Sequence, residues 1–325
     1  MTAEAETVEA EIEAVVCIPT FRRPDGLART LGSLAAQRTA RRFAVVMAEN
    51  DAAGRAGEGA ARRFLAEAPF PGRVVVEPVQ GNCSAINAAF GLALEAYPAA
   101  RYFLMIDDDE VASADWLERM VATAEAGADI VGGPVFPSLP EGARPGLARH
   151  PAFAPAYARS GPVPVIYGSG NCLITRAAFG RLGRPYFDPR YNFLGGGDTD
   201  FFVRARRAGL AFHWAAEAVV TEAVPAARTR PSWLAARGLR IGAVNHRIEL
   251  RHARGAAGRV LVVLKSLGIL ALAFPRGMRL LVGTGEPLIA LHPVLVGLGR
   301  TLAALGIETQ QYRAPGGTAT PGGAA

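Results

Sequence analysis

The stretch that decides the fold is Tyr102-Phe103-Leu104-Met105-Ile106-Asp107-Asp108-Asp109, in which five apolar residues precede three carboxylates. A short apolar run without polar alternation is typical of a strand buried on both faces of a sheet. The three acids then stand where the strand ends and a loop begins. Ligands in open α/β sheets bind beyond the carboxyl ends of the strands, so the pattern indicates a site at these acids.

Three adjacent carboxylates repel one another, and two interpretations account for them. A hard divalent cation with oxygen ligands would relieve the repulsion and take a substrate phosphate as a further ligand, so a metal–diphosphate site is the first hypothesis. Alternatively, the acids cap a following helix, expected over Ser113–Glu125, and complement its dipole. An EF-hand calcium loop is excluded, because the spaced acids, central Gly and closing Glu do not follow.

Three further strands are predicted upstream from similar apolar runs. They cover residues 14–18, 43–48 and 73–76, and segments of helical periodicity such as Asp25–Gln37 separate them. Strands that alternate with helices predict an α/β fold with a mostly parallel sheet and helices on both faces. Distinctive polar residues follow every predicted strand, at positions 20–23, 49–51, 81–87 and 107–109. These strand ends should converge on one edge of the sheet.

Composition favours a cytosolic protein with one catalytic domain and an appendage. The chain has 325 residues, half of them hydrophobic, which is enough for a large core. Its three cysteines, Cys17, Cys83 and Cys172, are far apart and lack metal-ligand spacing, as expected in a reducing compartment. Residues 1–13 are acidic and polar, unlike a signal peptide, and are predicted to be a disordered lead-in.

Glycine-rich segments mark the second half of the predicted domain. Residues 134–164 are rich in Pro and Gly and are expected to form an irregular loop over the substrate. In Gly168-Ser169-Gly170-Asn171, small residues before a strand indicate a close approach of backbone to ligand. Three glycines, 195–197, directly precede Asp198 at the start of a helix expected to reach about Ala208. They allow a tight bend that delivers the Asp198 carboxylate to the site; an ordinary N-cap is the alternative.

Six segments in order resemble bacterial family 2 glycosyltransferases of the GT-A fold, especially those of the succinoglycan and exopolysaccharide type. The segments are IPTFRRP, MAEND, GNCSAIN, MIDDDE, GSGNCLITR and GGGDTDFFVRARRAG, within residues 14–225. The resemblance implies a Rossmann-like GT-A domain that binds a nucleoside-diphosphate sugar, with UDP as the expected nucleotide, together with Mg²⁺ or Mn²⁺.

The resemblance also implies roles for individual residues. Asp107 and Asp109 match the DxD pair, of which the first faces the ribose and the last ligates the metal. Asp198 matches the acid that acts as catalytic base, and Glu49 falls where the family places an Asp that accepts from the nucleobase. The remaining residues expected to contact the donor are Pro19, Thr20, Asn87, Asp108, Gly170 and Asn171.

The chemistry of sugar transfer is consistent with those roles. A metal held by Asp109 and Asp107 would neutralise charge that grows on the leaving diphosphate. Asp198 would deprotonate the acceptor hydroxyl, and a base opposite the leaving group gives inversion. The Gln-x-x-Arg-Trp motif of processive synthases is not found near Trp233, so one sugar per encounter is expected.

Three positions depart from the family's pattern. Gly197 stands where Glu is common, Ile86 where Arg is common, and Thr221 where many relatives have a His that reaches the metal. These departures keep a catalytically impaired nucleotide-sugar-binding module open as an alternative. A nucleotidyltransferase is the other alternative, although 18-IPTFRRPDG-26 lacks the glycine run that such enzymes need.

The C-terminal region is basic and apolar. From Arg228 onward there are 13 Lys and Arg against three Glu, a net charge of +10, while residues 1–227 carry −4. Arginines recur on one sector of a helix predicted between Trp233 and Arg254, which could lie on an anionic leaflet. The apolar run 260–274 is about 22 Å long as a helix, short of the roughly 30 Å hydrocarbon core. A second run, 288–298, is expected to break at His292-Pro293.

These features predict peripheral contact with the inner face of the plasma membrane through the C-terminal region. That location suits the glycan or lipid-linked sugar acceptors that the resemblance implies. Nucleic acid is not an expected partner, because the arginines lack interleaved aromatics. The predicted organisation is a lead-in at 1–13, a GT-A domain at 14–227, a helical region at 228–312 and a disordered tail at 313–325.

Overall fold

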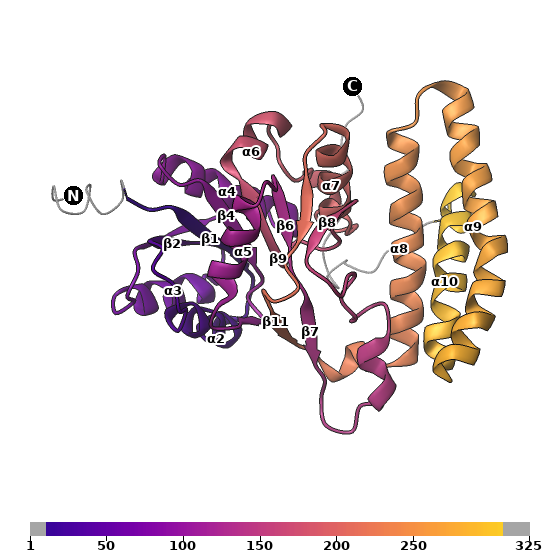
Figure 1. Ribbon diagram of the computed structural model, residues 1–325, viewed down its shortest axis with the longest axis horizontal. Helices are drawn as coiled ribbons and strands as arrows, with labels where there is room; N and C mark the ends of the chain where they lie inside the picture. The colour runs from indigo at the N-terminus through magenta and orange to yellow at the C-terminus, as the bar shows by residue number, and fades with distance from the viewer. Residues whose placement is uncertain (1–10, 308–325) are drawn as a thin grey trace.

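The computed structural model describes residues 11–307, which form an α/β body with three long helices standing along one side (Figure 1). An eight-stranded sheet runs through the body in the order β3-β2-β1-β4-β9-β6-β10-β8. Its strands, in chain order, are β1 (Ala14–Thr20), β2 (Phe43–Glu49), β3 (Gly72–Val76), β4 (Tyr102–Ile106), β6 (Ile130–Gly132), β8 (Gly161–Val163), β9 (Asn171–Thr175) and β10 (Phe212–Trp214).

The four strands predicted from the sequence form one parallel half of this sheet. β1 pairs in parallel with both β2 and β4, and β2 pairs in parallel with β3. The register places Thr20 opposite Glu49, so the ends of the first two strands are level. The α/β prediction is confirmed. Beyond β4 the sheet is mixed, because β9 runs antiparallel to β4 and β6 and β8 runs antiparallel to β10.

Helices cover both faces of the sheet. They are required because successive side chains of a strand point to opposite faces and both sets are apolar here. In β1, Val15 and Cys17 belong to one buried apolar cluster, and Val16 and Ile18 belong to a second one on the other face. The first cluster includes residues of α4 (Asn82–Ala96), α6 (Arg176–Leu182) and α7 (Gly197–Arg207). The second includes residues of α2 (Pro24–Ala35), α3 (Ala56–Leu65) and α5 (Trp116–Glu125). Ile12, within the predicted lead-in, is also buried.

The region 134–164 is more ordered than expected. It contains β7 (Val135–Ser138), the short 3-10 helix η1 (Pro145–Arg149) and β8. β7 pairs with β11 (Val220–Ala223), which also pairs with β5 (Glu110–Ala112) to make a three-stranded sheet. The prediction of a wholly irregular loop was wrong, because distant partners complete these short strands: β11 for β7 and β10 for β8. Two further 3-10 turns are η2 (Pro189–Tyr191) and η3 (Ala226–Thr229).

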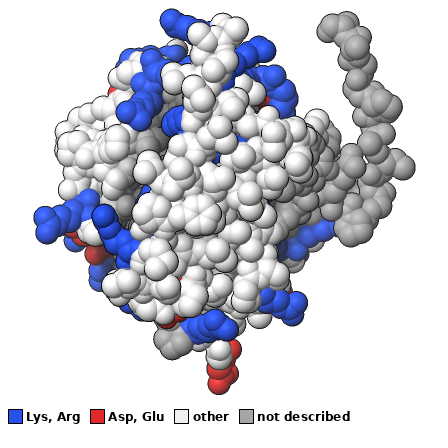
Figure 2. All heavy atoms as spheres, turned by 90° about the vertical axis from the view of Figure 1, so that its right-hand side faces the viewer, with Lys and Arg blue, Asp and Glu red and all other residues white. Residues whose placement is uncertain are grey.

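The C-terminal helices are longer than predicted. They are α8 (Pro231–Arg251), α9 (Gly255–Thr284) and α10 (Pro287–Ala304). α10 continues through Pro293, so the expected break at His292-Pro293 was wrong, and α9 likewise continues through Pro275. Both helices are long and apolar enough to cross a bilayer by length and composition, and only 17% and 22% of their apolar windows are buried. Their side of the molecule is a broad surface with few charged residues (Figure 2). The predicted tail at 313–325 and the lead-in before residue 11 lie outside the described residues.

Helix α10 packs against α8 through glycines that permit backbone contact. A Cβ added at Gly242 of α8 would lie 2.0 Å from the Val296 carbonyl oxygen, and one at Gly299 of α10 would lie 2.0 Å from the Leu239 oxygen. Across the same interface, Arg300 donates to Glu249 at 2.6 Å. The two helices therefore form a tight pair, and α9 packs on α10.

We predict that Gly242→Ala destabilises the fold by about 2 kcal/mol, because a methyl group there forces two backbones apart. The matched control is Gly268→Ala in α9, where a Cβ meets nothing within 4 Å. This control should be neutral or gain up to about 1 kcal/mol from helix propensity. Urea unfolding of both variants measures the difference; equal stabilities would contradict the backbone contact.

Candidate active site

Four carboxylates gather where β4 ends, and they come from three elements. Asp107 and Asp109 follow β4, and the Asp107 amide donates to Glu110 Oε2 at 2.8 Å. Glu110 opens β5 and is 3% exposed. The β5–β11 register places Glu222 directly opposite Glu110. The second sheet thus adds two acids that the sequence analysis did not assign to the site.

Burial and mutual repulsion raise the pKa values of Asp107, Glu110 and Glu222. Burial, followed by the charges of Asp109, Asp108 and Glu222, raises the pKa of Asp107 to about 8. Burial and the nearby Asp107 raise the pKa of Glu110 well above its ordinary value. Burial and Asp109 also raise the pKa of Glu222, although its ion pair with Arg228 opposes the shift. Such a cluster favours a bound cation, which would lower the cost of ionising all four groups.

An arginine partly neutralises the acid triplet. Arg23 lies 3.1 Å from Asp108 and 2.7 Å from Asp109. Asp108 also accepts from the Thr20 hydroxyl at 2.8 Å and from the Phe21 amide at 3.2 Å. Asp108 is therefore a bridge between the ends of β1 and β4, whereas Asp107 and Asp109 keep oxygens for another ligand. Oxygen donors of this kind fit Mg²⁺ or Mn²⁺.

The fit to a cation is incomplete without a substrate. Among residues 11–307, no three Asp, Glu, His or Cys side chains are placed as a ready-made ligand set. An ion at Asp107 and Asp109 would therefore need diphosphate oxygens and water as further ligands, which is common for Mg²⁺. Surface hollows of about 290 and 490 Å³ lie elsewhere, beside β3 and beside α5. The carboxylates mark the candidate site better than these hollows, because neither hollow includes a residue of the cluster.

The carboxylate of Glu49 accepts hydrogen bonds from the protein's own backbone. It is fully buried, and its two oxygens accept from the amides of Asp51 at 2.8 Å and Glu58 at 3.1 Å. Glu58 lies in the first turn of α3, so Glu49 caps that helix. The next residue, Asn50, accepts from Gly81 at 2.7 Å and donates to the carbonyls of Glu77 and Val79. Asn50 therefore shapes the loop after β3, a role that the sequence analysis missed.

Two predicted donor-contacting amides are also engaged in the scaffold. Asn87 donates to the Phe187 carbonyl at 2.6 Å and accepts from the Phe187 amide at 2.9 Å. Asn171 accepts from the Trp116 indole at 2.8 Å and donates to two carbonyls. Gly170, by contrast, lies at the acids, since a Cβ there would be 2.9 Å from Asp107 Oδ2. Pro19 lies in β1, directly before Thr20, the last residue of that strand.

Asp198 lies near the same acids although it is about ninety residues away in sequence. The negative charges of both Asp107 and Asp198 raise the pKa of the Cys172 thiol, after the larger effect of burial. Asp198 begins α7, where Gly195 and Gly196 take positive φ values of 73° and 89°. Its carboxylate accepts from the Thr199 amide at 2.7 Å. The charges of the two regions that sequence reasoning joined therefore act on the same buried thiol, which is consistent with a shared site.

Packing explains why Gly197 precedes Asp198. A Cβ at Gly197 would lie 2.3 Å from Cys83 Sγ in α4. A glutamate at this position would therefore require Cys83 or the start of α7 to move. Thr221, the third departure, pairs with Val111 in the small sheet, and its neighbour Glu222 supplies the acid on this strand.

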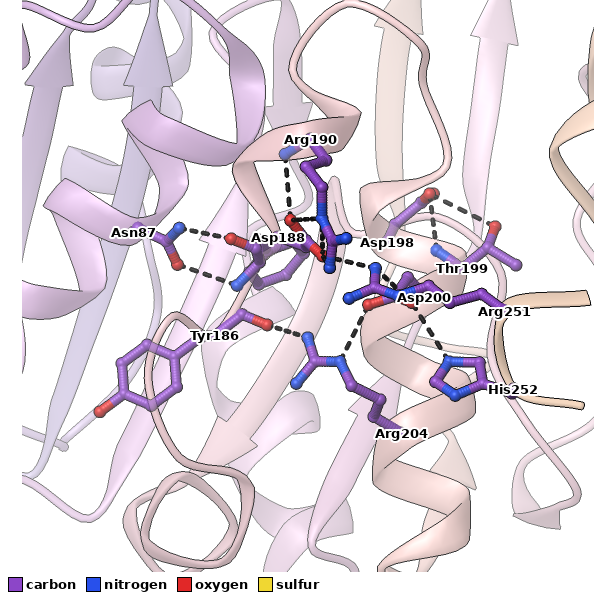
Figure 3. Close-up of polar contacts among 11 residues, drawn as sticks. Asn87, Tyr186, Asp188, Arg190, Asp198, Thr199, Asp200, Arg204, Arg251 and His252 are labelled. Carbon is purple, nitrogen blue, oxygen red and sulfur yellow. Dashed lines mark hydrogen bonds and ion pairs between the residues drawn. The ribbon is translucent and has the colours of Figure 1, made fainter. Parts of the chain in front are cut away.

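An ion-pair network ties α7 to the end of α8 (Figure 3). Asp200, which is 1% exposed, accepts from Arg204 at 2.9 Å and contacts His252 at 3.3 Å. Asp188 contacts Arg190 at 2.9 Å and is also paired with Arg251. Asp198 points away from this network, toward Thr199. The network fixes the helix that carries Asp198, and no sequence motif indicated it because its members come from three separate segments.

Comparison with known proteins identifies the family. The pattern of Glycosyl transferase family 2 matches residues 15–183. The chain is 34% identical to the succinoglycan biosynthesis protein ExoM of Rhizobium meliloti (strain 1021) over 262 residues. That alignment covers 75% of this chain and 77% of the relative.

Solved structures share the fold at low identity. The mannosyltransferase PcManGT from Pyrobaculum calidifontis, in complex with GDP-Man and Mn²⁺, matches with a TM-score of 0.56 and 17% identity, covering 89% of this chain and 86% of that one. S. aureus TarS 1-349 matches with a TM-score of 0.51 and 13% identity, covering 93% of each chain. GalNAc-T7 with UDP, GalNAc and Mn²⁺ matches with a TM-score of 0.51 and 12% identity over 70% of this chain, which spans about half (51%) of the GalNAc-T7 chain.

With the family pattern covering half of its length and a relative aligned over most of it, this chain belongs to glycosyl transferase family 2 and is a glycosyltransferase.

Proposed function

We propose that this protein is an inverting, metal-dependent, non-processive glycosyltransferase of exopolysaccharide biosynthesis. It transfers a sugar from a nucleoside-diphosphate sugar, with UDP as the expected nucleotide, to a hydroxyl of a glycan or lipid-linked sugar. The observation that carries the proposal is the cluster of Asp107, Glu110 and Glu222 at the end of β4. Asp198 supports it, because its charge, like those of Asp107 and Glu110, raises the pKa of the Cys172 thiol. The name of the ExoM relative supports the pathway, and the ligands of the structural neighbours support a nucleotide-sugar and Mn²⁺.

Each group has a defined task in this proposal. Asp109 and Asp107 would hold a divalent cation, which supplies neutralising charge to the diphosphate. Asp198 accepts the proton of the acceptor hydroxyl as it attacks the anomeric carbon. Gly170 lets the backbone approach Asp107 and Glu110, because a side chain there would collide with both carboxylates. Glu49, Asn87, Asn171 and Asp108 act through the scaffold, by holding the loops at the strand ends.

The proposal includes peripheral membrane contact at the cytoplasmic face. α9 and α10 are compatible with it, because little of either apolar window is buried within the protein. A lipid-linked acceptor would be available at that surface.

The first prediction concerns pH and cations. The pKa of Asp107 is raised in the folded state, from 3.8 to about 8. Protonated Asp107 therefore favours the folded state below about pH 4, and this contribution is lost as pH rises through about 8. In EDTA the melting temperature should fall between pH 5 and pH 8, and Mn²⁺ with UDP should reduce the fall. Asp107→Asn cannot ionise and should flatten the profile; an unchanged slope in this variant would show that another group is responsible.

The second prediction tests the base. Asp198→Asn should bind UDP with Mn²⁺ as the parent does, and should transfer sugar at least about a hundredfold more slowly. Calorimetry measures UDP binding. Release of nucleoside diphosphate from a panel of nucleotide-sugars, with a lipid-linked oligosaccharide extract as acceptor, measures transfer. The control is Asp25→Asn, an exposed acid on α2. Transfer by Asp198→Asn at the parental rate would assign the base to another residue.

The third prediction concerns the network in Figure 3. Arg251→Gln removes a partner that Asp188 and Asp200 share, and so loosens α7 against α8. We expect kcat to fall several-fold while the KM for the donor stays the same, because α7 carries the base and the acid triplet lies elsewhere. Arg251→Lys should restore part of the rate, and Arg38→Gln, which breaks an exposed pair with Asp115, should leave it unchanged. A change in donor KM alone would contradict this positioning role.

A further inference from the structure

Helix α9 presents large apolar side chains on the side opposite its packing contacts. Its buried residues, Val262, Ser266, Ala273 and Gly277, recur at intervals of four, seven and four and face the rest of the bundle. Seven large apolar residues are between 48% and 70% exposed and define the α9 outer face: Val260, Leu261, Leu264, Leu267, Leu272, Phe274 and Met278. A helix that faces water carries polar residues on its outer side. This face is therefore suited to an apolar environment.

Cationic residues surround the α9 outer face, and acids are absent from the helix. α9 contains no Asp or Glu, and Arg259, Arg276 and Arg279 are exposed along it. Figure 2 shows the broad apolar surface with Lys and Arg gathered toward its edges. A surface that is apolar in the centre and basic at the rim matches the interface of a bilayer that contains anionic lipids. The charge pattern favours this occupant over a second copy of the chain, whose own rim would be equally positive.

The packing of the helices decides how such a bilayer would meet α9. α10 contacts α8 at backbone distance through Gly242, and α8 is joined to the catalytic body by the Arg251–Asp188 pair. α9 packs along α10 and donates from Lys265 to Glu249 of α8 at 2.9 Å. A bilayer crossed by α9 would therefore also have to accommodate the charged residues of α8, which hydrocarbon disfavours.

The spacing of the charged residues along α9 also argues against a helix that crosses the bilayer. Residues 260–274 lie between Arg259 and Pro275-Arg276. As a helix this stretch is about 22 Å long, which is shorter than the roughly 30 Å hydrocarbon core of a bilayer. Across the bilayer, Arg276 and Arg279 would enter the acyl chains. In the plane of the leaflet, their guanidinium groups can reach lipid phosphates while the neighbouring side chains insert.

We propose that the α9 outer face lies in the plane of an anionic lipid leaflet and that the protein binds the membrane without crossing it. This inference deepens the membrane contact of the proposed function and does not depend on the donor or on the base. It also assigns the lipid contact to a different helix from the one predicted. The arginine-bearing helix predicted to lie on the leaflet, α8, packs within the molecule, and its Arg240 is 9% exposed. α9 takes its place as the lipid-facing helix.

Vesicle flotation with the full-length protein tests the surface. The protein should float with phosphatidylcholine vesicles that contain 30 mol% phosphatidylglycerol, and should float less with phosphatidylcholine alone or in high salt. The triple variant Leu264→Glu, Leu272→Glu, Met278→Glu places charges on the α9 outer face. It should lose at least about tenfold in the ratio of bound to free protein.

The matched control is Ala35→Glu, Ala66→Glu, Ala122→Glu, which adds the same charge at exposed positions of the catalytic body. It should bind vesicles nearly as the parent does. Both triple variants should retain the parental melting temperature and UDP binding, since every substituted side chain is exposed. If the α9 variant floats as well as the control, the inference is overturned, and the donor chemistry is not affected by that result.

A second measurement separates a helix in the plane from a helix across the bilayer. The native cysteines are buried, so a cysteine at Leu261 or at Val282 can be labelled selectively with an environment-sensitive fluorophore. These positions lie near the two ends of α9, about 32 Å apart along the helix. Nitroxide lipids confined to the outer leaflet should quench both labels. Quenching of one label only would show a spanning helix and overturn the in-plane orientation, while the proposed membrane contact would stand.

If the α9 outer face bound a second copy of the chain, the results would differ. Light scattering would show a dimer of the parent and a monomer of the α9 triple variant, and neither protein would float with vesicles. That result would overturn the lipid assignment. A parent that is monomeric without vesicles and binds anionic vesicles through this face supports it.

Discussion

Repulsion between buried carboxylates at the end of β4 is the constraint on which the site depends. The backbone forces it: Asp107 and Asp109 follow a strand in the centre of the sheet, and the β5–β11 pairing brings Glu110 and Glu222 to the same place. Arg23 offsets part of this charge, and burial keeps water from screening the rest. The fold thus holds acids together at a cost in stability, which is common where charge is needed for binding or chemistry.

Much of this arrangement can be predicted from the sequence, because it follows from local patterns. The apolar run before Asp107 indicates a central strand, and parallel strands bring their carboxyl ends to one edge. The glycines before Asp198 indicate a sharp turn that directs an acid, and Gly195 and Gly196 take the positive φ values that such a turn needs. In each case a few neighbouring residues determine the geometry.

The parts that could not be predicted depend on contacts between distant residues. Glu49 follows a strand just as Asp107 does, yet it caps α3, because Gly57 lets that helix approach closely. Asn87 and Asn171 look like ligand-binding amides, but Asn87 bonds the backbone of Phe187, 100 residues away, and Asn171 bonds an indole and two loop carbonyls. Pro275 suggests a helix end, but α9 continues through it because packing on α10 outweighs local propensity. The spacing of residues in the sequence does not indicate any of these long-range contacts.

The contact between Gly197 and Cys83 links two positions that are 114 residues apart in the chain, and it bears on how this enzyme can diverge. With a sulfur atom 2.3 Å from where a first side-chain carbon would sit, a larger residue at 197 requires a smaller one at 83 or a displaced helix. The two sites are thus expected to covary among close homologues. Restoring the acid that is common in the family would take a paired change, with glycine or alanine replacing the cysteine, because a single substitution at 197 meets an occupied volume.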